Sequence, residues 1–105
     1  MRVISQDETF DMPYEMSIVW CEDAGAVLLQ PIGETGEYQT FAKYSTEEKA
    51  KKAMEMLRIA YENNVFYHCT AGSKCFEEVR SILSEEQFQK ATTEYFQFPA
   101  EEELE

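Results

Sequence analysis

The chain is poor in basic residues and contains no long apolar run. Its 105 residues include 9 Lys or Arg against 21 Asp or Glu, which gives a formal net charge of -12. Because nucleic acids attract proteins through clustered lysine and arginine, this balance argues against direct nucleic-acid binding. No stretch approaches the ~20 apolar residues of a membrane span, and residues 1–5 are too short and too polar for a signal peptide. We therefore expect a soluble, cytoplasmic protein that does not enter membranes.

Cysteine and histidine are also scarce, and this limits the chemistry available. Cys21, Cys69 and Cys75 are an odd number, so reduced thiols are expected rather than a disulfide framework. His68 with Cys69 and Cys75 offers zinc three ligands, one fewer than a structural site requires. The sequence also lacks a phosphate-binding glycine loop and a nucleophile elbow. We therefore predict no catalytic residues, no metal and no cofactor.

A small enzyme centred on His68 and Cys69 is the least favoured alternative. Residues 65–68 are predicted to form a strand, and neighbouring residues of an extended segment point to opposite faces. His68 would then not reach the Cys69 thiol to act as its base.

The apolar pattern predicts a single α+β domain. Apolar residues make up 44% of the chain, which is enough for one modest core. Runs of β-forming residues predict strands over residues 16–21, 26–30 and 38–44, and residues 22–25, which end in a glycine, predict a hairpin turn. A further run of β-forming residues predicts a last strand over residues 95–98. We expect an antiparallel β-meander covered by one main helix over residues 1–99, with a flexible acidic tail over residues 100–105.

The main helix is predicted to begin at Ser45. Ser45 and Glu48 have the spacing of a capping box, and Asn63–Asn64 predicts the end of the helix. Glu47 with Lys51 and Glu48 with Lys52 have the spacing of favourable ion pairs. The face expected to pack on the sheet carries Ala50, Ala53, Met54, Leu57, Ala60 and Tyr61. A second C-terminal helical region is predicted from Ser73, with an apolar stripe of Phe76, Val79, Ile82 and Leu83.

The negative charge is concentrated outside the main helix. Residues 1–42 hold one basic and eight acidic residues, residues 43–62 hold five and four, and residues 63–105 hold three and nine. This pattern is typical of a solvated acidic surface that keeps a small protein in solution. It also fits a surface whose carboxylates stand where phosphates stand in a basic nucleic-acid channel. The candidate partner-binding residues are Glu15, Glu22, Asp23, Glu34, Glu37, Glu77, Glu78, Glu85 and Glu86.

Three stretches resemble a family of small uncharacterised proteins of Firmicutes, their phages and other mobile elements. They are residues 1–7 with Pro13-Tyr14-Glu15, residues 42–57, and residues 95–99 with the acidic tail. The family pattern has a glycine after Asp7, where this chain has Glu8. The resemblance implies a shared scaffold and a bacterial or phage cytoplasm, and it supplies no activity. By class, small acidic phage proteins without catalytic motifs are similar to anti-CRISPR proteins.

Two non-enzymatic hypotheses follow. The leading one is an acidic inhibitor that binds a basic nucleic-acid-handling protein, most concretely a type II CRISPR effector nuclease, and blocks DNA binding or cleavage. The alternative is a self-associating scaffold or regulatory protein, a homodimer formed through the helix residues Met54, Met56 and Ile59.

Overall fold

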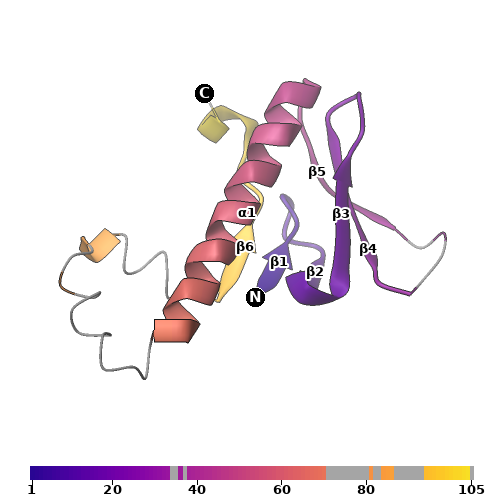
Figure 1. Ribbon diagram of the computed structural model, residues 1–105. Helices are drawn as coiled ribbons and strands as arrows, with labels where there is room; N and C mark the ends of the chain where they lie inside the picture. Colours follow the sequence, from indigo (N-terminus) through magenta and orange to yellow (C-terminus); the bar gives the residue numbers. More distant parts are fainter. Residues whose placement is uncertain (34–35, 37, 71–80, 82–83, 87–93, 105) are drawn as a thin grey trace.

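The computed structural model describes residues 1–33, 36, 38–70, 81, 84–86 and 94–104. It confirms the predicted α+β class, with antiparallel strands and one main helix. The long helix α1 (Glu47–Thr70) lies along one side of a three-stranded sheet (Figure 1). The predicted second helical region falls almost entirely outside the described residues. The other elements are β1 (Arg2–Ile4), β2 (Asp11–Pro13), η1 (Tyr14–Met16), β3 (Ser17–Cys21), β4 (Ala26–Pro31), β5 (Gln39–Lys43), β6 (Tyr95–Gln97) and η2 (Glu101–Leu104).

The strands form two sheets. The antiparallel sheet β3-β4-β5 contains the three strands of the predicted meander. In the second sheet, β1 lies between β2 and β6, antiparallel to β2 and parallel to β6. Parallel strands need a long connection, and here most of the chain runs between β1 and β6. The second sheet therefore joins the two ends of the sequence.

A β-bulge in β5 contacts the turn that follows β1. Val27 pairs with Ala42 and Leu28 with Thr40, which leaves Phe41 as the extra residue. The Phe41 carbonyl accepts a hydrogen bond from the Gln6 backbone N–H at 2.6 Å. Because the bulge breaks the alternation of the strand, the consecutive side chains of Phe41 and Ala42 are both buried.

The core lies between α1 and both sheets. The predicted helix face is confirmed, since Ala50, Ala53 and Leu57 are at most 1% exposed. They pack with buried residues of β1, β4, β5 and the end of β6, among them Val3, Val27, Leu29, Phe41 and Phe98. One core therefore serves both sheets.

The start of α1 differs from the prediction by one residue. Thr46, not Ser45, caps the helix: its hydroxyl oxygen accepts the Lys49 backbone N–H at 3.2 Å. The Ser45 N–H donates instead to the Glu101 carboxylate, so the predicted Ser45–Glu48 capping box is wrong. Both Ser45 and Thr46 have a suitable side chain, and the contact from the distant Glu101 decides between them.

The end of α1 was predicted too early. The helix passes through Asn63 and Asn64 and ends at Thr70, so the strand predicted over residues 65–68 is wrong. Asn64 lies seven residues after Leu57 on the same side of the helix and is 4% exposed. Burial at this position outweighs the weak helix propensity of asparagine.

The acidic C-terminus packs against the fold. Residues 101–104, expected as a flexible tail, form η2, and Leu104 is 4% exposed within the core cluster. Lys52, predicted to pair with Glu48, donates to the Leu104 carbonyl oxygen. Of the two predicted helix ion pairs, Glu47–Lys51 is present at 3.0 Å.

The turn between β1 and β2 holds a residue in the left-handed region. Glu8 has a φ of 66°. Asp7 stabilises this turn by accepting hydrogen bonds from the Ser5 hydroxyl at 2.7 Å and the Thr9 hydroxyl at 2.6 Å. The turn therefore forms without glycine, at the cost of a strained backbone.

Candidate protein-binding surface

The β3–β4 hairpin holds two of the predicted partner-binding residues beside the start of α1. Gly25 closes the turn with a φ of 96°, and its carbonyl oxygen accepts the Tyr44 N–H at 2.9 Å. A Cβ at this position would lie 2.2 Å from the Tyr44 carbonyl oxygen, so only glycine allows the close approach. As a result, the exposed carboxylates of Glu22 and Asp23 stand next to the first turn of the helix.

η2 brings further carboxylates to the same end of the molecule. Glu101 accepts the Ser45 N–H and lies 3.9 Å from the Lys49 ammonium, which fixes η2 against the start of α1. Glu102 and Glu103, the next two residues, are exposed. Figure 1 shows the hairpin, the start of α1 and η2 at one end of the molecule. We call the four exposed carboxylates of Glu22, Asp23, Glu102 and Glu103 the acidic pole.

The carboxylates of the acidic pole are little compensated within the described residues, since Asp23 alone interacts with a lysine, Lys51, whose pKa is raised mainly by its hydrogen bond to Glu47 and least by the charge of Asp23. No ion pair or side-chain hydrogen bond joins any of the four to another described residue. Their field is felt inside the fold: burial, and then the charges of Glu103 and Glu101, raise the pKa of the Tyr44 hydroxyl. The lysines of the first helical turns contact other groups, Lys51 pairing with Glu47 and Lys52 with the Leu104 carbonyl. The pole is therefore a negative surface free to attract an external cation.

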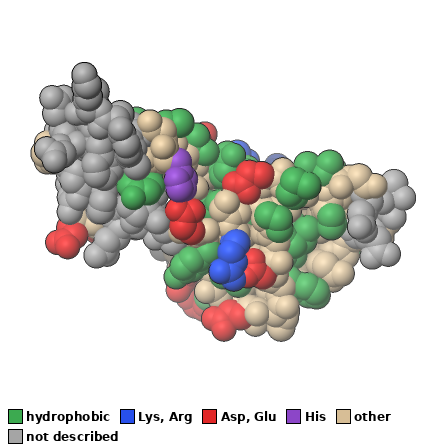
Figure 2. Space-filling model, turned by 90° about the horizontal axis from the view of Figure 1, so that it is seen from below, with side chains coloured by type: hydrophobic (Ala, Val, Ile, Leu, Met, Phe, Trp, Pro, Cys, Tyr) green, Lys and Arg blue, Asp and Glu red, His purple; other side chains and the backbone are tan. Residues whose placement is uncertain are grey.

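The opposite end of the molecule is electrostatically different. There Arg2 pairs with Asp11, and His68 lies 3.0 Å from Glu94. Figure 2, which views this end, shows the histidine (purple) against an acidic side chain (red), and a basic side chain (blue) against another acidic one. Asp11, Glu15 and Glu94 therefore have partners at this end, whereas none of the four pole carboxylates forms an ion pair with another described residue.

The structure separates the predicted partner-binding residues into several places. Glu15 lies at the end of β3 away from Glu22 and accepts a hydrogen bond from the Met1 ammonium at 2.6 Å. Partial burial raises the pKa of Glu15, but this hydrogen bond, a backbone hydrogen bond and the charge of the N-terminus together hold the pKa below its usual value. The segment of Glu85 and Glu86, both exposed, lies across α1 from the hairpin (Figure 1). Glu34, Glu37, Glu77 and Glu78 lie outside the described residues.

Sequence reasoning missed Glu102 and Glu103. They were assigned to the tail, because a run of four acidic residues near a terminus is typical of a solvated segment. The signal that could have found them is Leu104, a single large apolar residue within that run. Its burial fixes the preceding carboxylates in place.

A groove runs between α1 and β3. Its wider part, of about 550 Å³, is lined by Cys21, Glu48, Lys51, Lys52, Met54, Glu55 and Arg58. A neighbouring part of about 350 Å³ is lined by Tyr14, Glu15, Ser17, Val19, Met54, Leu57, Arg58 and Tyr61. Met54 and Arg58 line both parts, so the groove is continuous along the helix. Met56 and Ile59, predicted with Met54 to mediate self-association, are exposed at 36% and 48% and do not line it.

The remaining chemical candidates give no centre in the described part of the chain. His68 and Cys69 follow one another on the last turn of α1, where Cys69 is an exposed free thiol. No three described His, Cys, Asp or Glu side chains gather in a way that would hold a metal ion. Cys75, the third residue of the zinc alternative, lies outside the described residues. No described helix is both long enough and apolar enough to cross a lipid bilayer.

Comparison with known proteins adds no relative. No family model, curated protein or solved structure matches the chain.

Proposed function

We propose that this protein is a non-enzymatic interaction protein that binds a basic, nucleic-acid-handling protein through the acidic pole. The observation that carries the proposal is the set of four exposed carboxylates, Glu22, Asp23, Glu102 and Glu103, without ion-pair partners among the described residues. Elements some eighty residues apart in the sequence bring the two pairs to the same end of the molecule, on either side of the start of α1 (Figure 1), so the pole is built by the fold rather than by a local run of charge. A rigid array of carboxylates presents lysine and arginine side chains with the charge that phosphates present.

The resemblance to phage-associated proteins makes the proposed partner more specific. A type II CRISPR effector nuclease has a basic channel for its heteroduplex and basic side chains that contact the adjacent DNA. Acting in a bacterial cytoplasm, the pole would compete with DNA for such a surface. Charge-driven binding of this kind weakens as salt increases, because ions screen exposed charges over a Debye length of ~10 Å at 0.1 M.

The test is inhibition of a guide-loaded type II nuclease. The protein is added before or after target DNA at two salt concentrations, and cleavage and DNA retention are measured. Inhibition only when it is added before DNA supports competition for the DNA channel, and inhibition in both orders supports a blocked cleavage step. Absence of inhibition across several type II nucleases would reject this partner.

Matched variants locate the binding surface. Glu22→Gln with Asp23→Asn, and Glu102→Gln with Glu103→Gln, each remove two charges from the pole. Glu85→Gln with Glu86→Gln removes two charges from the predicted site across the helix. We expect both pole variants to weaken inhibition by about tenfold, since loss of ~1.4 kcal/mol of binding energy corresponds to that factor. Equal effects of all three variants would mean that only net charge matters, and would reject the acidic pole as the binding surface.

A further inference from the structure

β3 is an edge strand with free backbone groups. Among the described strands it pairs with β4 alone, in an antiparallel register that places Val19 opposite Leu29. The bonds Ile32 N–H to Met16 C=O and Glu22 N–H to Ala26 C=O fix which residues of this strand bond to β4. Because bonding alternates along an antiparallel strand, the N–H and C=O groups of Val19 and Cys21 point away from β4. Such an edge is a template for another strand.

The free groups of β3 are self-complementary. The Ser17 N–H already donates to the Tyr14 carbonyl, whereas its own carbonyl is directed outward. A second β3, antiparallel and centred on Val19, would exchange two hydrogen bonds between the two Val19 residues. The Cys21 N–H of each copy would then reach the Ser17 C=O of the other. These four bonds use every outward donor of the strand.

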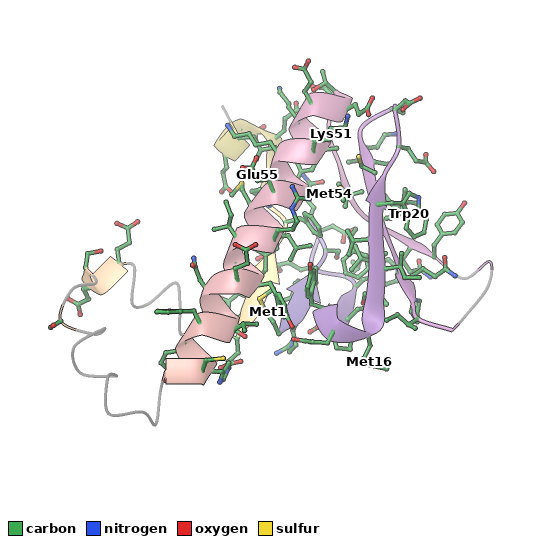
Figure 3. All side chains as sticks on the ribbon, in the orientation of Figure 1. Met1, Met16, Trp20, Lys51, Met54 and Glu55 are labelled. Carbon is green, nitrogen blue, oxygen red and sulfur yellow. The ribbon has the colours of Figure 1, made fainter. Side chains whose placement is uncertain are left out.

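The side chains beside this edge are also complementary to themselves. Ile18, which is 50% exposed, and Trp20 lie on the sheet face away from α1, where Trp20 contacts Tyr38 (Figure 3). In the same antiparallel pairing, Trp20 of one copy lies opposite Ile18 of the other. Pairs of an aromatic and a β-branched residue are among the favourable cross-strand pairs.

The groove side of α1 has charges with the same symmetry. Glu48 and Arg58 lie five residues on either side of Ala53, and Lys51 and Glu55 lie two residues on either side, all four lining the groove. Two antiparallel copies of the helix would therefore place Glu48 against Arg58 and Lys51 against Glu55. Met54, which follows Ala53 in the helix, lines the groove together with Val19 in one part and with Cys21 in the other. The centre of the charge pattern on α1 therefore lies beside Val19, the centre of the strand pairing.

We propose that the protein forms a two-fold homodimer in which β3 pairs with β3 of a second copy and the groove sides of α1 face each other. A second copy is favoured over another protein because strand and helix are each complementary to themselves about one centre. The groove side of α1 also balances its acidic residues with basic ones, which matters when copies with a net charge of -12 approach each other. The dimer leaves both acidic poles exposed, and it does not depend on the proposed function.

The test is sedimentation equilibrium of the full chain across a wide concentration range. We expect a monomer–dimer equilibrium in which Arg58→Glu raises the dissociation constant at least tenfold, because two like-charge contacts form per dimer. Lys43→Glu makes the same charge change on β5, away from this edge, and is expected to have less than a threefold effect. Glu48→Arg combined with Arg58→Glu should restore wild-type affinity. Within one helix, these residues are ~15 Å apart along the axis and cannot form the rescuing pair.

A second variant tests the strand. Val19→Pro removes an N–H that bonds to no other described residue, so a folded monomer is expected, with the dimer lost. Circular dichroism confirms folding of each variant. A monomer at every concentration would overturn the dimer and leave the β3 edge to an extended segment of another protein. Equal effects of Arg58→Glu and Lys43→Glu, failure of the double variant to rescue, or loss of the dimer on Met56→Glu alone would also overturn it.

Discussion

The hairpin that carries half of the acidic pole depends on one glycine, so Gly25→Ala is expected to be severely destabilising. A Cβ on Gly25 would lie 2.2 Å from the Tyr44 carbonyl oxygen and 3.0 Å from the Thr46 carbonyl oxygen. Both are backbone atoms, which cannot rotate out of the way as a side chain would. The hairpin must therefore move away from the start of α1, and the hydrogen bond from Tyr44 to Gly25 breaks.

The magnitude follows from three contributions. A left-handed φ costs an alanine about 1–2 kcal/mol, and a lost hydrogen bond costs about 1 kcal/mol. Relief of the steric overlap adds to both, so we expect the free energy of unfolding to fall by about 3 kcal/mol or more. Gly33 provides the control: its φ is 91°, close to the 96° of Gly25, but no atom lies within 4 Å of its Cβ position. Gly33→Ala should cost only the backbone part, about 1–2 kcal/mol.

Urea denaturation of both variants, followed by circular dichroism, measures the two free energies. The difference between them isolates the contact between the hairpin and the start of α1. If the two alanine variants lose the same stability, the hairpin does not press against Tyr44, and the position of Glu22 and Asp23 beside the helix would be refuted.

Three other predictions concern the ends of the chain. Leu104→Ala is expected to cost about 2–4 kcal/mol in urea denaturation, because it empties a buried site, whereas a mobile tail would lose nothing. Glu8→Gly should raise stability by about 0.5–1 kcal/mol, measured as a higher thermal midpoint, since glycine adopts the φ of 66° without strain. Hydrogen bonds from Thr9 and Ser5 hold the pKa of Asp7 below its usual value, so its stabilisation is present above pH ~4 and is lost as pH falls through the folded-state pKa. The stability difference between wild type and Asp7→Ala should therefore shrink from pH 6 to pH 2 in urea titrations, and a constant difference would contradict this.

The parts of the fold predicted correctly are those set by local pattern. The antiparallel strands, the hairpin at Gly25 and the buried face of α1 follow from side-chain period and turn chemistry. The early stop predicted at Asn63–Asn64 failed because burial of Asn64 overrides its propensity. Strict alternation likewise cannot place Phe41 and Ala42 on the same side, since the bulge that does so is bonded to Gln6, in the distant turn after β1.

The candidate site was only partly predictable for a similar reason. Glu22 and Asp23 are found from a turn signal, which is local. Glu102 and Glu103 join them through a contact between Glu101 and Ser45, residues 56 apart in the sequence. No period or motif in a single sequence encodes that contact, and net charge alone cannot distinguish acids held together from acids dispersed.

The acidic pole raises the question of how the fold tolerates like charges at one end. The N-terminus of α1 lies there, and its partial positive charge favours nearby carboxylates. Lys49 and Lys51 add ion pairs to Glu101 and Glu47, so the inner carboxylates of this end stabilise the structure. The outer four carboxylates form no such ion pairs among the described residues, and the weak attraction of Asp23 to Lys51 and of all four to the helix N-terminus is set against their mutual repulsion, so their net contribution to the folded state is small. Their removal should therefore preserve stability while weakening partner binding, which is the combination expected of residues that serve an external surface rather than the fold.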